Sequence, residues 1–310
     1  MPEYIVQKAV NLDKVVKKRR LVLEQPGYLD QNYLGQAKYD GCHVIFVLTV
    51  AGEADLVLSR TGERVRSMEH MLPAMHRLFA DQVMEHGGVA VLGEAWTEGE
   101  SFATLSGQFR QHAPAPQLGV KVFDVLTSNE WEAGESTVPY IQRVQRVLRP
   151  QYRADVDWVS AAEFHFTPKT TGRGNTWQDW CNHLVDQGGY DGCILRDPEG
   201  GWKRGSGTTG EIIKLKRVLS FDLRVTGMEE GKGKHAGRLG AIVVDFRGKE
   251  LRVGTGFSDY EREKWWRLQD ADGTTVVGCI AEIEAMDYSE DGLLREPRFK
   301  GIRFDKLETD

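Results

Sequence analysis

A lysine, a carboxylate and a glycine stand just before a pair of β-rich runs, and this junction constrains the fold more than any other feature. Lys38, Asp40 and Gly41 belong to the segment Gln36-Ala37-Lys38-Tyr39-Asp40-Gly41. Residues 41–50 and 55–60 are rich in β-branched and aromatic residues, and a short turn containing glycine separates them. Such runs predict a β-hairpin, so we expect Lys38 at the entrance to a strand. A lysine held there is a candidate nucleophile.

Length and overall composition indicate only the broad class of the protein. The chain has 310 residues, of which 40% are hydrophobic and 28% charged, which is typical of a globular protein long enough for two domains. Its apolar stretches are shorter than the roughly 20 residues of a membrane span, and residues 1–20 are too charged for a secretory signal. We therefore expect an intracellular protein with no membrane partner.

Cysteine spacing and net charge exclude further classes. Cys42, Cys181, Cys193 and Cys279 form no C-x-x-C pair, so neither a zinc ribbon nor a redox dithiol is indicated. The net charge of −6 argues against a protein that coats nucleic acid indiscriminately, although a local basic surface is compatible with it.

Periodicity predicts a mixed α+β domain over residues 1–217. Apolar residues recur at helical spacing over residues 68–86, despite Pro73. Further helices are predicted over residues 140–148 and 176–187, and strands over 88–96, 119–126, 190–196 and 211–216.

A second domain is predicted over residues 218–310. Short β-rich runs occupy residues 221–228, 238–246, 250–256, 276–286 and 299–304, and a helix capped by Ser258 is expected over 258–268. Five strands and one helix fit an OB-fold β-barrel.

Lys214 and Lys216 are two residues apart on a predicted strand, so their side chains should point to the same face. There they would bind phosphate and assist Lys38, whose amine reacts only when neutral. Taken alone, two such lysines more often mark a solvated edge strand.

Two carboxylates suit a hard cation. Glu94 lies inside an apolar run, where burial requires a partner, and Asp191 precedes Gly192 at the start of another. Magnesium typically takes one or two carboxylates together with substrate phosphates. A structural salt bridge for Glu94 and an ordinary Asp-Gly turn for Asp191 remain alternatives.

The remaining candidates suit a nucleotide and a phosphate chain. Phe123 could stack on a purine, although a core phenylalanine is commoner, and Arg60 is placed to donate to ribose or phosphate. Basic clusters at residues 14–20, 203–204, 232–238 and 295–306, with glycine-rich loops at 205–210 and 231–240, favour contact with a duplex backbone.

The ordered set resembles the covalent nucleotidyltransferases, and most closely the small ATP-dependent DNA ligases of the phage type. The likeness covers nearly the whole chain. It rests on Lys38-Tyr39-Asp40-Gly41, Ser59-Arg60-Thr61-Gly62, Glu94, Phe123-Asp124, Asp191-Gly192, Lys214-Leu215-Lys216, the segment from Gly231 through Gly240, and the segment from Arg298 through Lys306.

The resemblance implies an ATP-grasp-like ligase catalytic domain over residues 1–217, an OB-fold domain over 218–310, and an intracellular monomer of DNA repair, replication and recombination. Lys38 would take AMP from ATP, pass it to the 5′-phosphate of nicked double-stranded DNA, and the 3′-hydroxyl would displace it, with Mg²⁺ as cofactor.

The same resemblance implies individual roles. Asp40 would assist Lys38, Gln36 and Ala37 would lie at the adenine, Phe123 would stack on it, and Arg60 and Glu94 would hold the ribose. The α-phosphate would be gripped by Lys214 and Lys216, the metal supported by Glu94 and Asp191, and the triphosphate covered by Arg303, Asp305 and Lys306. DNA would be bound by Lys203, Arg204, Lys232, Lys234 and Arg298.

Three departures separate this chain from the usual family pattern. His43 stands where arginine is usual, Asp191 where glutamate is usual, and Ile212-Ile213 where a tryptophan often precedes the lysine pair. Two alternatives stay open: an RNA ligase or capping guanylyltransferase with the same lysine chemistry, and a DNA-binding protein that has lost catalysis.

Overall fold

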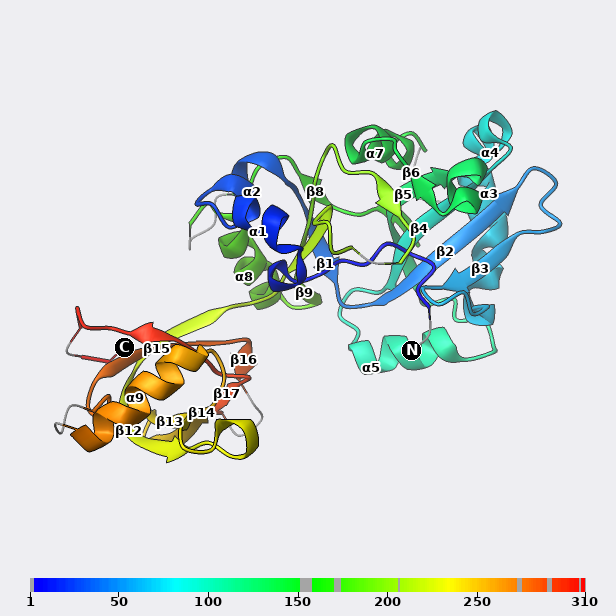
Figure 1. Ribbon diagram of the computed structural model, residues 1–310. Helices are drawn as coiled ribbons and strands as arrows, with labels where there is room; N and C mark the ends of the chain where they lie inside the picture. The colour runs from blue at the N-terminus through cyan, green and yellow to red at the C-terminus, as the bar shows by residue number, and fades with distance from the viewer. Residues whose placement is uncertain are drawn as a thin grey trace. The chain divides into compact units, whose positions relative to one another are not determined.

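The computed structural model describes residues 3–150, 158–169, 174–205, 207–271, 275–288, 292–306 and 308–309. Ser206, within the predicted loop at 205–210, lies outside them. The chain divides into two compact units, Met1–Lys216 and Arg217–Asp310 (Figure 1). Each unit has its own hydrophobic core.

A five-stranded sheet forms the centre of the first unit. Its order is β3 (Leu56–Ser59), β2 (Cys42–Thr49), β4 (Gly88–Trp96), β5 (Gly119–Thr127) and β7 (Val159–Ala161). Strand β2 runs antiparallel to both β3 and β4, which confirms the predicted hairpin. In this register His43 lies opposite Glu94.

A second sheet of the first unit carries the predicted nucleophile. Its order is β11 (Ile212–Leu215), β9 (Tyr190–Arg196), β1 (Leu34–Tyr39) and β8 (Phe164–His165), all antiparallel. The sequence did not predict β1, so Lys38 lies near the end of one strand rather than only at the entrance to the next. A two-stranded pair joins β6 (Glu135–Ser136) and β10 (Trp202–Lys203).

Helices cover these sheets. They are α1 (Lys17–Leu23), α2 (Tyr28–Asn32), α3 (Leu72–Leu78), α4 (Ala80–His86), α5 (Phe102–Arg110), α6 (Ser128–Ala133), α7 (Tyr140–Leu148) and α8 (Trp177–Gln187). The helices predicted at 140–148 and 176–187 are confirmed. The single helix predicted over 68–86 is wrong: a 3₁₀ turn, η2 (Arg66–Met71), precedes α3, in whose first turn Pro73 lies, and the chain breaks again at Phe79.

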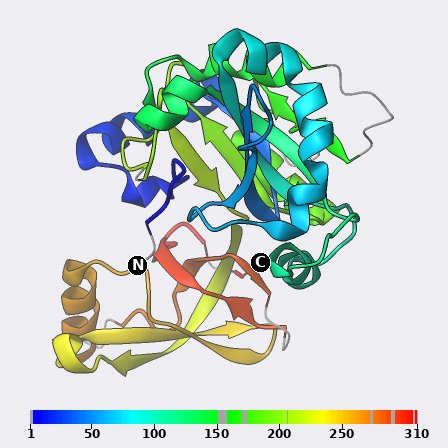
Figure 2. The ribbon, with the colours of Figure 1, turned by 90° about the vertical axis from the view of Figure 1, so that its right-hand side faces the viewer.

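The second unit contains a five-stranded antiparallel sheet of order β14 (Lys249–Val253), β13 (Leu239–Phe246), β12 (Leu219–Glu230), β15 (Ile280–Ala285) and β18 (Arg298–Ile302). Helix α9 (Asp259–Ala271) contacts β13 and is capped by Ser258, whose hydroxyl accepts from Glu261 N. Figure 2 shows α9 in orange beside the yellow strands of its unit. A short pair joins β16 (Asp287–Tyr288) and β17 (Leu294–Arg295).

The predicted strands and helix of the second unit are therefore confirmed, but its barrel is not closed. Among the described residues the outer strands β14 and β18 share no ladder; one isolated bridge joins Thr255 to Arg298. No helix in the described ranges is long and apolar enough to cross a membrane.

Candidate active site

Lys38 makes an ion pair with Asp191, and a local irregularity of the sheet directs the two side chains together. Strand β1 pairs with β9 in regular register up to Ala37, and the register shifts between Ala37 and Tyr39. Lys38 Nζ lies 2.6 Å from Asp191 Oδ2, and Lys216 Nζ lies 3.1 Å from Asp191 Oδ1. All three side chains are partly exposed, at 24%, 31% and 37% for Lys38, Asp191 and Lys216. The site is thus open to a ligand.

Two glycines of the predicted motifs permit this close packing. A Cβ at Gly41 would lie 2.3 Å from Ala95 O and 2.9 Å from Glu94 Cγ, so only glycine lets the chain pass β4 here. Gly192 has a φ of +126°, and a Cβ there would lie 2.1 Å from Leu215 O. These glycines therefore bring β1, β4, β9 and β11 into one site.

The charges of the site perturb each other. Burial acts to raise the pKa of the Asp191 carboxyl, but the charge and hydrogen bond of Lys38, with those of Lys216, lower it overall. Burial and the charge of Asp191 raise the pKa of Asp40. Burial lowers the pKa of Lys214, and the positive charges of Lys216 and Lys38 lower it further. The structure thus brings these five predicted residues together.

Glu94 is the most perturbed carboxylate of this cluster. Burial raises its pKa to about 8, against the opposing charges of Lys38 and Arg60, while the charge of Asp40 adds to the rise. Arg60 follows β3, and its guanidinium lies 5.3 Å from the centre of the Tyr4 ring. Glu94 is therefore a carboxylate that a cationic or hydroxyl-bearing ligand would stabilise.

No ready metal site exists in the described part of the chain. A group of three or more histidine, cysteine, aspartate or glutamate side chains suited to a metal ion is absent there. Both oxygens of Asp191 accept hydrogen bonds from lysines. A metal supported by Asp191 would have to replace at least one of these lysines.

His43 occupies the position where the family usually has arginine, and its imidazole is neutral. Burial lowers its pKa to about 3, with the charges of Arg196 and Arg60 contributing. Its ring meets Phe123 edge to face at 5.2 Å. The Nε2 atom is buried and has no hydrogen-bond partner among the described residues.

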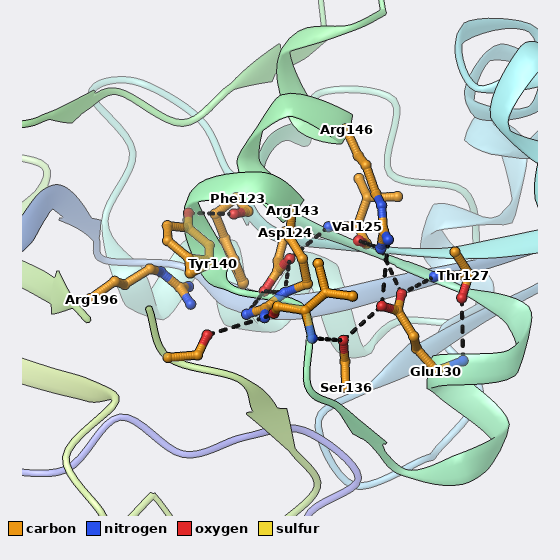
Figure 3. Close-up of polar contacts among 12 residues, drawn as sticks. Phe123, Asp124, Val125, Thr127, Glu130, Ser136, Tyr140, Arg143, Arg146 and Arg196 are labelled. Atoms are coloured by element: carbon orange, nitrogen blue, oxygen red, sulfur yellow. Dashed lines mark hydrogen bonds and ion pairs between the residues drawn. The ribbon is translucent and has the colours of Figure 1, made fainter. Parts of the chain in front are cut away.

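Gln36 and Phe123 belong to a buried network that sequence reasoning missed. Gln36 Nε2 donates to Tyr140 Oη at 2.9 Å, and Arg196 Nε donates to Gln36 Oε1 at 2.6 Å. Tyr140 Oη in turn donates to Phe123 O. The Arg196 guanidinium lies 5.0 Å from the Phe123 ring and 4.6 Å from the Tyr140 ring. Figure 3 shows Arg196, Tyr140 and Phe123 side by side.

The contacts with Arg196 and Tyr140 fix Gln36 and Phe123, two of the candidate adenine contacts, before any ligand binds. Gln36 is only 3% exposed, and Ala37 is also buried. Neither Arg196 nor Tyr140 had a local signal, because their hydrogen bonds to Gln36 span 160 and 104 positions of the chain. The roles of Gln36 and Ala37 at the adenine stay predictions.

Asp124, next to Phe123, makes a buried ion pair with Arg143 of α7. Both side chains are 1% exposed, and Arg143 Nε lies 3.1 Å from Asp124 Oδ1. Arg143 Nη1 also donates to Val138 O and to Gly200 O. The pair, which lies at the centre of Figure 3, anchors β5 to α7 and so supports Phe123 from behind.

The candidate DNA-binding residues lie in both units. In the first unit Lys203 is 74% exposed and lies 3.6 Å from Glu135, while Arg204 stacks on Trp131. In the second unit Lys232 and Lys234 line a pocket of about 740 Å³, and Arg298 lines a neighbouring one of about 410 Å³. Gly240, Arg252, Gly254 and Thr255 line both of these pockets.

Arg303, Asp305 and Lys306 lie together in the second unit, just after β18. Arg303 Nε and Nη2 donate to the two carboxylate oxygens of Asp305 at 2.9 and 2.7 Å. Arg303 Nη1 and Lys306 Nζ both donate to Asp222 of β12. Asp222 was not among the predicted residues.

Comparison with known proteins finds similarity to DNA ligases. Residues 230–303 match a family model described as the DNA ligase OB-like domain. A DNA ligase of Natronomonas pharaonis is 33% identical over 141 residues, which are 39% of this chain and 26% of that protein. The DNA ligase of Enterobacteria phage T3 is 24% identical and is matched over 96% of this chain and 94% of its own length.

Solved structures show the same fold. The ATP-dependent DNA ligase of bacteriophage T7 in complex with ATP has a TM-score of 0.50 and 20% identity, over 96% of this chain and 98% of that one. The predicted α+β class, with a nucleotidyltransferase domain followed by an OB-type domain, is confirmed. The family-model match over residues 230–303 and the match to the phage T3 ligase over nearly the whole chain make this protein similar to the small ATP-dependent DNA ligases.

Proposed function

We propose that the chain is a DNA ligase that uses ATP to seal nicks in duplex DNA through an AMP adduct on Lys38. The observation that carries this proposal is the half-buried ion pair of Lys38 with Asp191, flanked by Lys216. Asp40, Glu94 and Arg60 lie within electrostatic reach of the same cluster. An amine among alternating charges suits attack on a polyphosphate.

In the first step Lys38 Nζ loses its proton and attacks the α-phosphorus of ATP. A phosphorus–nitrogen bond forms, and the bond from the α-phosphorus to pyrophosphate breaks. Asp191, at 2.6 Å, is the nearest carboxylate to the departing proton. Lys214 and Lys216 hold the α-phosphate, whose negative charge replaces the Asp191 carboxylate as the partner of Lys216.

The nucleotide is held by residues of three strands and a turn. Phe123 stacks on the adenine, with Gln36 and Ala37 at its edge, and Arg60 and Glu94 hold the ribose. Gln36 has one amide hydrogen left for this contact, because Tyr140 takes only the other.

Magnesium fits this site only with the nucleotide present. Glu94 and Asp191 supply two carboxylates, and a magnesium ion usually takes one or two together with phosphate oxygens and water. When bound it would neutralise charge on the phosphates. Asp191 would then lose its contact with one of its two lysines and bind the ion instead.

In the later steps AMP passes from Lys38 to the 5′-phosphate at a nick, and the 3′-hydroxyl displaces it. The basic residues Lys203 and Arg204 of the first unit, and Lys232, Lys234 and Arg298 of the second, hold the phosphate backbone. We assign residues 1–217 to the adenylation domain and 218–310 to the OB-fold domain. The protein acts as an intracellular monomer in DNA repair, replication or recombination.

The proposal is tested by incubating the chain with labelled ATP or GTP and magnesium, then locating added mass by peptide mass spectrometry. AMP should appear on the Lys38 peptide, and a nicked duplex should be sealed. Lys38→Ala should abolish both activities, while Lys169→Ala, which removes an exposed lysine paired with Glu163 and outside every basic cluster named above, should change neither. Label retained from GTP alone, sealing of broken RNA only, or sealing by Lys38→Ala would contradict the assignment.

A further inference from the structure

Asp222 is a buried carboxylate that binds two of the three residues expected to cover the triphosphate. It lies on β12, opposite Glu282 of β15, and is 4% exposed. Its Oδ1 and Oδ2 lie 3.4 and 3.3 Å from Arg303 Nη1, and Oδ2 also accepts from Lys306 Nζ. A carboxylate so far from water requires such partners, so these contacts are strongly favoured.

The same turn is held by its backbone. Arg303 N donates to Ile280 O at 2.8 Å, and Lys306 N donates to Arg303 O at 3.3 Å. Phe304, between them, is 79% exposed and has little part in the packing. The side-chain directions of Arg303 and Lys306 are therefore set by what their charged ends bind.

The three acidic partners of Arg303 differ in their exposure. The side chain of Asp305 is 66% exposed and that of Glu282, 4.0 Å from Arg303 Nη1, is 34% exposed, whereas the side chain of Asp222 is 5% exposed. Water can replace Asp305 at little cost, but it cannot reach Asp222 in the same way. Asp222 is thus the permanent anchor, and the fork of Arg303 that faces Asp305 is the part that can be released to a phosphate.

We propose that Asp222 is a positioning residue for the first step: it holds Arg303 Nη1 and Lys306 Nζ in one place, so that the remaining donors of both side chains meet the β- and γ-phosphates of ATP. The inference rests on the proposed function. On this inference Asp222 is needed only for formation of the Lys38 adduct, because the sealing of a nick that already carries AMP involves no triphosphate.

The test uses the full chain and two reactions. Asp222→Asn preserves the size of the side chain and removes its charge, so the two cations lose their common partner. Formation of the Lys38 adduct should slow at least about tenfold, whereas sealing of a duplex already bearing AMP on the 5′-phosphate at the nick should stay within about twofold. Asp245→Asn, in neighbouring β13, is the matched control, because Asp245 is exposed and accepts a hydrogen bond from Gly248 N in the hairpin.

A double-mutant cycle separates positioning from folding. If Asp222 acts by holding Lys306, adding Asp222→Asn to Lys306→Gln should slow adduct formation by less than it slows it in the wild-type chain. Asp222→Glu retains the charge, so the inference can be tested even if Asp222→Asn does not fold. The ratio of adduct formation to sealing in Asp222→Glu should be near that of the wild type.

Three results would overturn the inference: equal loss of both reactions in a folded Asp222 variant, additive effects in the cycle, or adduct formation by Asp222→Asn at the wild-type rate. The proposed function fails separately, if the wild-type chain forms no adduct with ATP.

Discussion

At the scale of single residues, the site is a set of charges that are stable only in combination. Lys38 and Asp191 are 153 positions apart, and the shift of register beside Lys38 turns their side chains together. Asp191 accepts from two lysines, while Asp40 and Glu94 remain the carboxylates whose pKa is raised. A nucleotide, whose phosphates and hydroxyl groups also bind lysines and carboxylates, would therefore replace some of these contacts within the site.

His43 provides a test of how this site tolerates charge. Its pKa is lowered to about 3, so the folded chain binds fewer protons than the unfolded chain between about pH 3 and the ordinary histidine pKa of about 6.5. Stability should therefore fall as pH decreases through this range. Relative to His43→Gln, the wild type should lose about 1–2 kcal/mol of unfolding free energy between pH 8 and pH 5.

Urea denaturation of both proteins at the two pH values measures this difference. His112→Gln is the matched control, because it makes the same substitution at an exposed histidine. An equal gap between wild type and His43→Gln at pH 8 and pH 5 would show that His43 does not have the buried, neutral state described here.

At the scale of elements, local patterns predicted those strands and helices whose partners are mainly apolar. Strand β4 and helices α7 and α8 have such patterns and were found. Strand β1 was missed because Gln36 and Lys38 interrupt its apolar pattern; they are satisfied by Tyr140, Arg196 and Asp191, far away in the chain. The same holds for the candidate site. The ordered motifs predicted its charged residues, but Arg196 and Tyr140 were missed because their contacts with Gln36 are distant in sequence.

Helix α6 was also missed, although Thr127 and Glu130 have the spacing of a capping box. Glu130 joins three elements: its carboxylate accepts from Thr127 N of α6's cap, Ser136 Oγ of β6 and Arg146 Nη1 of α7 (Figure 3). Burial acts to raise its pKa, but the hydrogen bonds from Arg146, Ser136 and Thr127 lower it overall.

Glu130→Gln should therefore destabilise the first unit by about 2 kcal/mol at pH 7. Because the folded pKa of Glu130 is lowered, its contribution is present above the unfolded value of about 4.3 and is lost as pH falls below it. The difference from wild type, measured by urea denaturation, should shrink towards pH 4 and below. Glu132→Gln, on the exposed side of the same helix, should have little effect, and a gap at Glu130 that does not change with pH would exclude a charged anchor.

At the scale of the whole molecule, the residues proposed for the chemistry belong to two units with separate cores. Lys38, Glu94 and Asp191 belong to the first, and Arg303, Asp305 and Lys306 to the second. Each core consists of residues from its own unit. Units built in this way can fold independently. Formation of the Lys38 adduct should therefore require the second unit for its residues Arg303, Asp305 and Lys306, and not because the second unit helps the first unit to fold.

Separation of the units tests this division. A fragment of residues 1–216 should unfold cooperatively on its own, because it retains its core, yet form the Lys38 adduct at least about 100-fold more slowly than the full chain, since the three residues expected over the triphosphate are missing. Adding a fragment of residues 217–310 should restore the rate as its concentration rises, and the same fragment with Lys306→Gln should not. Circular dichroism follows folding, and labelled ATP follows the adduct. Full-rate adduct formation by residues 1–216 alone would show that Arg303, Asp305 and Lys306 have no part in the first step.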